Sequence, residues 1–306
     1  MTPFSLTVMM YHYVRDSGDE AEAGSGIPGL PVTRFEAQLD ELARRHEMIG
    51  WPDLRAGLSG EKSLPPGACL LTFDDGLRDH YLNVFPALRA RGLSGLFFAL
   101  ARGPGDGLAL GHKIHFLLAH LGVERLREAA WLRLTPEAQT AYARAEERYR
   151  ASGHAGGESP EVGVLKSVLQ RELLPEAQGL LSQLFEEHIG PEAEMAREFY
   201  LMQDQIAEMA ANGMNFGGHS RSHPWFDWVD APCQAEEIEA SAAWLREIEA
   251  GPWAFAYPYG GLSGESPGLL RAHDFAAAFT TVEQVHHADP FFIGRWDGEL
   301  FARTTL

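Results

Sequence analysis

The segment ACLLTFDDG (residues 68–76) begins as an uninterrupted apolar run and ends in two carboxylates and a glycine. A short apolar run of this kind, closed by a glycine, is typical of a strand that is buried on both faces, as in parallel sheets. Successive side chains of a strand point to opposite faces, but a turn through Gly76 lets both Asp74 and Asp75 reach one site. The segment therefore predicts a buried strand with a polar site at its carboxyl end.

A second motif, GHSRSHP (residues 218–224), places His219 and His223 four positions apart. In a turn or short helix this spacing directs both imidazoles the same way. Two imidazoles and one carboxylate suit Zn²⁺ or another divalent first-row metal, and they leave positions open for water and substrate. Spacing alone fits surface histidines equally well, and Asp-Asp-Gly alone also fits a turn that caps the next helix. Together the motifs favour a metal-dependent hydrolase.

Several residues that could act in catalysis or bind a metal follow directly on short apolar runs. They are His12, Asp74, Asp75, His219, His223, Tyr259, Arg295 and Asp297. If the runs are parallel strands, their carboxyl ends meet at one rim, where (β/α) barrels carry their active sites. We therefore expect an α/β fold of the (β/α) barrel type, with its last strands at residues 275–281 and 291–293.

The middle of the chain, residues 101–198, is rich in Ala, Glu, Leu and Arg and poor in β-branched residues. Thr135 followed by Pro136 is typical of a helix start. We predict a mostly helical insertion here, between two barrel halves at 1–100 and 199–306. A separate helical domain on a linker is the alternative. The insertion is favoured because His219 lies beyond this region and still has to reach Asp75.

Composition limits the partners that we expect. The formal net charge of −18 and the pI near 5.1 argue against a nucleic-acid or anionic-membrane partner. The two cysteines, Cys69 and Cys233, are far apart and suggest no disulfide or cysteine-based zinc site. The N-terminus resembles no signal peptide, and no apolar run approaches the ~18 residues of a membrane span. We expect a soluble, cytoplasmic protein, and the sequence leaves its oligomeric state open.

Three motifs together resemble a known family. TFDDG (72–76), HSRSHP (219–224) and FAYPYG (255–260) are similar, in this order, to the motifs of the polysaccharide deacetylases, carbohydrate esterase family four. The resemblance covers both flanks of the chain, and the insertion is not part of the minimal family domain. It implies a distorted (β/α) barrel with a metal at the strand ends.

The resemblance also implies roles for individual residues. By position, Asp75, His219 and His223 are the metal ligands, and we expect the metal to be Zn²⁺. Asp74 is then the general base that activates the metal-bound water. The backbone N–H of Tyr259 joins the metal in stabilising the tetrahedral oxyanion.

Candidate substrate contacts lie beside these motifs. They are Tyr257, Pro258 and Trp225. Trp225, alone or with Phe226 or Trp228, would form an apolar wall for the acetyl methyl group or the sugar ring. Tryptophans near a turn also fit a place in the hydrophobic core.

The sequence departs from the family at two points. Many members have an Arg that orients the base at the position of Ala256, and Arg295 is the candidate to supply that charge from another strand. The late Leu-x-His context of the general acid is also missing, and His287 is the nearest match, in a loop-like setting. The opening MMYH (9–12), however, resembles circularly permuted members such as poly-N-acetylglucosamine deacetylases. That resemblance favours His12 as the acid, although a core histidine at a strand end also fits.

The sequence therefore predicts a hydrolase that removes an acetyl group from an N-acetylated sugar or glycan precursor. The expected absence of an export signal favours a lipid-linked or nucleotide-linked precursor over finished wall polymer. One alternative is a metal-dependent amidohydrolase that acts on a non-sugar amide. Another is a catalytically inactive carbohydrate-binding protein on the same barrel.

Overall fold

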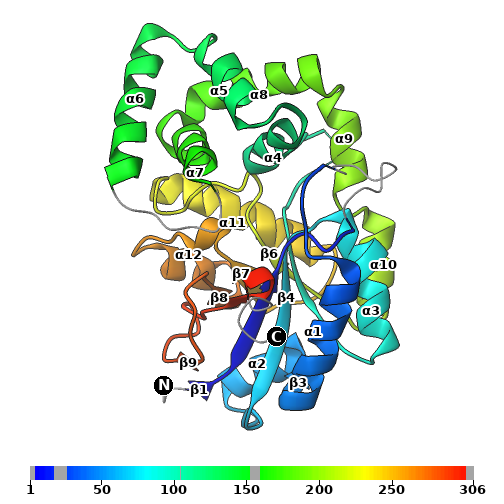
Figure 1. Ribbon diagram of the computed structural model, residues 1–306. Coiled ribbons are helices and arrows are strands. Elements are labelled where there is room, and N and C mark those ends of the chain that lie inside the picture. The colour runs from blue at the N-terminus through cyan, green and yellow to red at the C-terminus, as the bar shows by residue number, and fades with distance from the viewer. Residues whose placement is uncertain (1–3, 17–25, 104, 152–158, 301–306) are drawn as a thin grey trace. The chain divides into compact units, whose positions relative to one another are not determined.

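The computed structural model describes residues 4–16, 26–103, 105–151 and 159–300. The chain divides into two units (Figure 1). Unit 1 comprises Met1–Ser17, Pro28–Arg102 and Glu198–Leu306, and unit 2 comprises Gly18–Ile27 and Gly103–Arg197. The main segment of unit 2 lies within the predicted insertion, and each unit has a hydrophobic core of its own.

The main sheet of unit 1 is parallel throughout its described strands, in the order β10-β2-β4-β5-β6-β7-β8, with β3 paired to the first half of β4. Its strands are β2 (Thr7–Tyr11), β3 (Glu47–Ile49), β4 (Ala68–Asp75), β5 (Leu96–Ala99), β6 (Asn215–Gly218), β7 (Trp253–Ala256), β8 (Phe275–Phe279) and β10 (Trp296–Asp297). Because the strands are parallel, their carboxyl ends share one rim. The predicted distorted (β/α) barrel is confirmed.

Helices cover the outer face of this sheet. They are α1 (Val32–Arg45), the π-turn η1 (His80–Val84) with α3 (Phe85–Ala90), α10 (Gln203–Ala211), α11 (Ala231–Arg246) and α12 (Ser266–Ala272). Helix α2 (Trp51–Ser59) packs instead with the inward-facing residues of the strands, through Trp51 and Leu54. Figure 1 shows α1, α3 and α10 on one side of β4. Apolar side chains of α1, α3 and α10 pack in one cluster with the outward-facing residues of β2 and β4. This layer of helices buries the outer face of the sheet, as expected for strands formed by apolar runs.

The alternation along β4 separates two layers of core. Leu71 and Phe73 belong to the cluster between sheet and helices, whereas Leu70 belongs to a second cluster with inward-facing residues of neighbouring strands. Thr72 and Asp74 share the parity of Leu70, so their side chains face the barrel interior. The strand thus delivers one carboxylate to the inside of the barrel at its carboxyl end.

The end of the chain differs from the sequence prediction. Residues 291–293 form no strand; Ile293 makes only an isolated bridge to Phe279, and the strand is Trp296–Asp297, paired with β2. Gly294 lies between the two contacts, where a Cβ would come within 2.0 Å of the Val282 carbonyl oxygen. The close approach that Gly294 permits lets the segment pass from the β8 edge to the β2 edge, which closes the barrel. The predicted strand at 291–293 is wrong, because the strand forms instead where the chain meets β2, a partner remote in sequence.

A second correction concerns His286 and His287, which the sequence suggests to be loop-like. They form β9, which pairs antiparallel with β1 (Phe4–Ser5). No local sequence pattern predicts this pairing, because the two segments are far apart in sequence.

Unit 2 is built of helices among its described residues. They are α4 (Leu110–Leu121), α5 (Val123–Trp131), α6 (Pro136–Ala151), α7 (Pro160–Ser167), the π-turn η2 (Val168–Glu172), α8 (Leu174–His188) and most of α9 (Glu192–Phe199). The predicted helix start is confirmed, because the Thr135 hydroxyl accepts a hydrogen bond from the Ala138 amide at 3.2 Å. Buried Lys113 pairs with Glu192 at 2.9 Å and donates to Ser182 at 2.8 Å.

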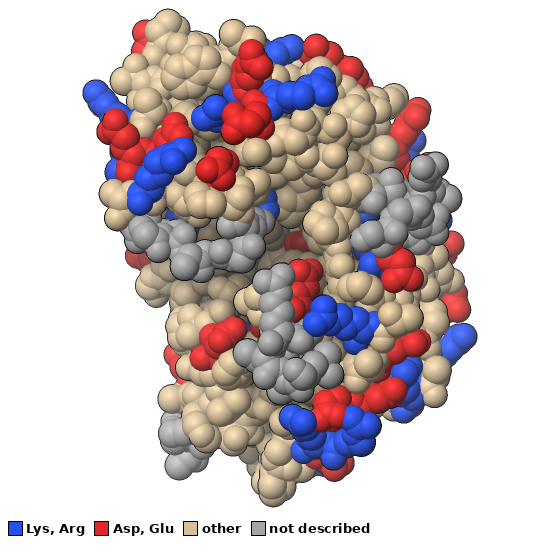
Figure 2. All heavy atoms as spheres, in the orientation of Figure 1, with Lys and Arg blue, Asp and Glu red and all other residues tan. Residues whose placement is uncertain are grey.

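The surface mixes both signs of charge. Figure 2 shows Lys and Arg side chains lying beside Asp and Glu on the face that it presents. Within the described ranges, none of the helices combines the length and the apolar character that crossing a bilayer requires.

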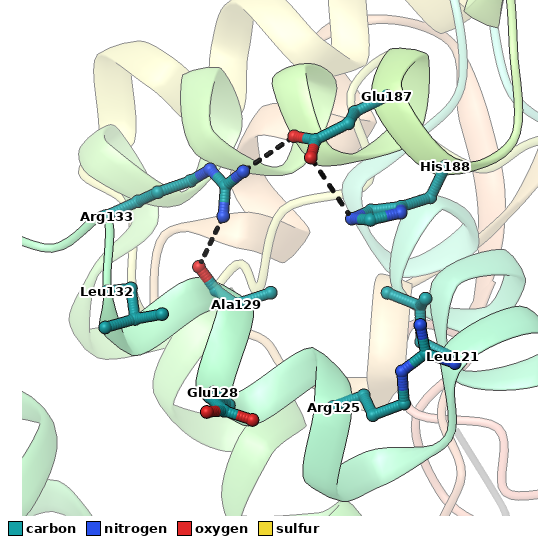
Figure 3. Close-up of a pocket in the computed structure, with 8 residues that line it drawn as sticks. All are labelled: Leu121, Arg125, Glu128, Ala129, Leu132, Arg133, Glu187 and His188. Carbon is teal, nitrogen blue, oxygen red and sulfur yellow. Dashed lines mark hydrogen bonds and ion pairs between the residues drawn. The ribbon is translucent and has the colours of Figure 1, made fainter.

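Unit 2 carries a surface pocket of about 240 Å³ (Figure 3). It is lined by Leu121, Arg125, Glu128, Ala129, Leu132, Arg133, Glu187 and His188. Its charged groups largely satisfy one another: Arg133 donates to Glu187 at 2.6 Å, and the His188 ring lies 3.7 Å from the same carboxylate. The potential metal ligands described below all belong to unit 1, whereas the residues that line this pocket belong to unit 2.

The close packing of β6 makes a testable prediction. A Cβ at Gly217 would lie 2.6 Å from the Phe98 ring and 2.8 Å from the Ala254 carbonyl oxygen. We expect Gly217→Ala to destabilise the protein by about 1–3 kcal/mol through overpacking, measured by urea unfolding. The control is Gly268→Ala on α12, where nothing lies within 4 Å of the added methyl group. The control should be neutral or slightly stabilising, and equal losses in both variants would contradict the packing argument.

Candidate metal centre

Three side chains converge at the carboxyl rim of the barrel. Asp75 ends β4, His219 follows β6, and His223 lies one turn further along the same loop. Asp75 Oδ1 is 3.4 Å from Nε2 of each histidine, and the two Nε2 atoms are 3.1 Å apart. Asp75 and His219 are buried and His223 is partly buried. The structure thus brings together the three predicted ligands as a group of suitable size for one metal ion.

The hydrogen bonding of His219 fits a ligand role. Its Nδ1 donates to the Ala256 carbonyl oxygen at 2.7 Å, which leaves Nε2 with a lone pair directed toward the other two residues. Burial lowers the pKa of His219, but the neighbouring carboxylates of Asp75 and Asp74 outweigh it and raise the pKa above its ordinary value. The same negative field attracts a cation to this point. A carboxylate and two imidazoles with this field fit a divalent metal.

Unusual backbone conformations gather at the same place. Asp75, Ser220, His223 and Tyr259 have φ values of 77°, 66°, 62° and 57°, in the left-handed region that non-glycine residues rarely adopt. Among the described non-glycine residues the fifth with positive φ is Asp274, on the β7–β8 connection. Such strain persists where the surrounding structure imposes it, and it clusters at functional sites. At Asp75 it ends the strand alternation, so this carboxylate departs from the direction that the alternation would give it.

Asp74 is held by a buried arginine. Arg295 donates from Nη1 and Nη2 to the two carboxylate oxygens of Asp74 at 2.6 and 2.7 Å, and from Nε to the Thr280 carbonyl oxygen at 3.0 Å. Burial alone would raise the pKa of Asp74, but the Arg295 guanidinium keeps it below its ordinary value. Asp74 is therefore an ionised carboxylate with a fixed orientation. Arg295 is therefore in a position to supply the charge that the resemblance leads us to expect at position 256.

Thr72 is a member of this network that the sequence analysis missed. Its hydroxyl donates to the Met9 carbonyl oxygen at 2.7 Å and lies 3.2 Å from Arg295 Nη1. The alternation of side chains along a strand could have indicated it, because residues two apart, such as Thr72 and Asp74, face the same side of β4.

The two candidate acids lie at opposite ends of β2. His12 follows the carboxyl end, and its Nε2 is 3.9 Å from Asp74 Oδ2, with a side chain that is 37% exposed. His287 is fully buried, and its Nε2 bonds to the Leu6 carbonyl oxygen at 3.1 Å, before the strand begins. Of the two, only His12 stands beside Asp74.

The segment that carries His12 is fixed by residues just after the Asp motif. The His80 ring donates to the His12 carbonyl oxygen at 2.9 Å, and Asn83 donates to the Val14 carbonyl oxygen at 2.8 Å. A buried ion pair joins Arg15 to Asp79, with N–O distances of 2.6 and 2.7 Å. No local pattern in the sequence indicates these contacts, because their partners are 64 to 69 positions apart.

The aromatic candidates separate into two groups. Trp225 stacks on Tyr259, with ring centroids 4.3 Å apart, and the Tyr259 ring lies 4.4 Å from that of His223. Tyr257 is fully buried in the core, where its hydroxyl donates to the Phe291 carbonyl oxygen, and Pro258 is buried as well. Tyr257 packs in the cluster between the sheet and the helices, away from the barrel interior, and the burial of both residues argues against the predicted substrate contacts.

The other aromatic residues near the second motif are not part of the stack. Phe226 is fully buried in the core, whereas Trp228 is 48% exposed. Trp225, which is partly exposed, is the candidate that reaches both the centre and solvent.

Sequence comparison supports the resemblance that the motifs indicated. A sequence model of the family described as "Polysaccharide deacetylase" matches residues 166–278, a span that contains the second and third motifs. YxkH of Bacillus subtilis (strain 168), which is provisionally named a polysaccharide deacetylase, is 27% identical over 139 residues. That match spans 45% of this chain and 43% of YxkH, less than half of either protein. The predicted resemblance to polysaccharide deacetylases is confirmed.

Solved structures share the fold over nearly the whole chain. The deacetylase PplD of Streptococcus pyogenes, in complex with acetate, aligns with a TM-score of 0.59 and 16% identity over 100% of both chains. IcaB of Ammonifex degensii aligns with a TM-score of 0.58 and 20% identity over 98% of this chain and 96% of its own. At these identities the likeness establishes the fold.

Removal of one partner of the buried Arg295–Asp74 pair is expected to destabilise the protein strongly. Arg295→Gln leaves the Asp74 charge buried without its partner, and we expect a loss of about 3–5 kcal/mol in urea unfolding. The double variant Asp74→Asn/Arg295→Gln removes both charges and should recover part of that loss. A single variant as stable as the wild type would contradict the role of this pair.

Proposed function

We propose that this chain is a metal-dependent deacetylase that hydrolyses the N-acetyl group of a sugar or glycan. The observation that carries the proposal is the convergence of Asp75, His219 and His223 beside an ionised, arginine-held Asp74 at one rim of the barrel. The resemblance to polysaccharide deacetylases supports the choice of an acetylated sugar as the substrate class.

In this proposal Asp75, His219 and His223 hold a divalent cation, with Zn²⁺ as the expected ion. The cation supplies Lewis-acid chemistry, which polarises the amide carbonyl and acidifies water. Asp74 receives the proton of the attacking water, and Arg295 keeps that carboxylate ionised and correctly oriented until it does. The backbone N–H of Tyr259 would stabilise the oxyanion.

Breaking the C–N bond requires a proton on the leaving amine. His12 is the proposed donor, because its Nε2 lies 3.9 Å from Asp74 Oδ2 and its side chain is partly exposed to an incoming substrate. Water adds to the carbonyl carbon, the C–N bond breaks, and the products are acetate and the free amine. The stacked Trp225 and Tyr259 rings support a contact with the sugar ring or the acetyl methyl group.

The proposal is tested by acetate release from small N-acetyl sugars before and after metal removal. A strong chelator should abolish acetate release, because it removes the metal that activates water. Addition of Zn²⁺ or Co²⁺ should restore acetate release. Full activity of the metal-stripped protein would reject the mechanism. A parallel panel of linear and cyclic non-sugar amides tests the sugar assignment, which fails if those amides are the better substrates.

A matched variant separates a catalyst from an inactive binder. Asp74→Asn should lower kcat by about 100- to 10,000-fold while one equivalent of metal remains bound, since the ligands are untouched. Metal content is measured on the same preparation.

The position of His12 predicts a second kinetic effect. His12→Ala should lower kcat by about 100-fold or more, because the leaving amine loses its proton donor. His287→Phe is the control, because His287 bonds to the Leu6 carbonyl oxygen at the other end of β2, and its ring lies 5.3 Å from that of Phe4. Comparison of kcat for both variants checks the assignment, and a loss confined to the His287 variant would reverse it.

A further inference from the structure

The loop from His219 to His223 satisfies its backbone polar groups through neighbouring elements. The His219 amide donates to the Ala99 carbonyl oxygen at 3.2 Å, and the Ser220 carbonyl oxygen accepts from the Ala101 amide at 2.8 Å. The His223 amide donates to the Ser220 hydroxyl at 3.1 Å. The amides of Arg221 and Ser222, which lie between the two histidines, have another partner, and that partner helps to hold the loop.

Those two amides share one carboxylate. Glu237, on α11, accepts from the Arg221 amide at 2.6 Å and from the Ser222 amide at 2.8 Å, both through Oε2. Its other oxygen accepts from the Ser222 hydroxyl at 2.5 Å. Successive backbone amides after a left-handed residue form a concave anion site, and Ser220 has φ 66°. The carboxylate of Glu237 fills that site.

The Glu237 side chain does not cap its own helix. The helix α11 begins at Ala231, and its N-cap is Asp230, whose side chain accepts from the Cys233 amide. Glu237 lies in the second turn and is partly buried, and its carboxylate accepts hydrogen bonds from the histidine loop.

We propose that Glu237 is a positioning residue for the metal centre. Its carboxylate holds the peptide units between His219 and His223 and so fixes the strained geometry that points both Nε2 atoms at Asp75. This inference rests on the proposed function, because it assigns the loop the task of binding metal. Residues that orient metal ligands in this way typically change metal affinity by about 10- to 100-fold when they are removed.

The first measurement is Zn²⁺ affinity, determined by competition with a chromophoric chelator on the full chain after metal stripping. Glu237→Gln is expected to raise the Kd by about 10- to 100-fold. Glu236→Gln is the matched control, because Glu236 is the exposed neighbour on the same helix, and its Kd should equal that of the wild type. An unchanged Kd for Glu237→Gln overturns the inference.

A charge effect is separated from positioning by Glu237→Asp. This variant keeps the negative charge but withdraws the oxygens from the loop by one methylene group. Positioning predicts weaker Zn²⁺ binding here too, whereas wild-type affinity would show that only the charge matters and would overturn the inference.

A second measurement needs neither metal nor activity. Amide hydrogen exchange of the metal-free protein should be faster at Arg221 and Ser222 in Glu237→Gln than in the wild type, with unchanged exchange in β4 and β5. Unchanged exchange at both amides overturns the positioning role. If the wild type binds no divalent metal, the proposed function fails instead, and the exchange result still reports whether Glu237 holds the loop.

Discussion

The buried pair between Arg295 and Asp74 joins the closure of the barrel to its chemistry. A charge inside a protein is costly unless it is paired and hydrogen-bonded, so each partner requires the other. Arg295 lies on the segment that passes from β8 to β2, and it also donates to Thr280 at the end of β8. The strand that carries Asp74, the proposed base, and the segment that closes the barrel are therefore fixed together. The two hydrogen bonds from Arg295 to Asp74 thus serve the fold and also orient this carboxylate.

The ligand geometry depends on loops whose backbone is imposed by their surroundings. Asp75 leaves the strand through a left-handed residue, and the His219–His223 loop contains two more. None of these conformations is favourable in isolation. They persist because β5 and α11 accept or donate the hydrogen bonds of the loop, so the spacing of the two imidazoles is a property of three elements. Under the proposed function, these neighbouring elements hold the two imidazoles beside Asp75 in a geometry that suits a cation.

The sequence correctly predicted the features that depend on local residue patterns. The apolar run before Asp74 and Asp75 specified a buried strand, and the four-residue spacing of the histidines specified a shared direction. It could not place what depends on long-range packing. The burial of Tyr257 between the sheet and the helices and the position of the last strand both follow from contacts with segments remote in sequence. The role of Glu237 was invisible for the same reason, since an acidic residue on a helix usually faces solvent.

The same reasoning explains how the proposed acid and base stay in register. Asp74 lies on β4, and the next turn of chain provides Asp79, His80 and Asn83, which bind the segment after β2. The backbone of His12 is thus held by the continuation of the strand that carries Asp74. Burial lowers the pKa of His80, so this ring stays neutral, and it serves as a donor to the His12 carbonyl oxygen. Because one continuous segment sets both positions, a displacement of β4 would carry the base and the acid together and preserve their separation.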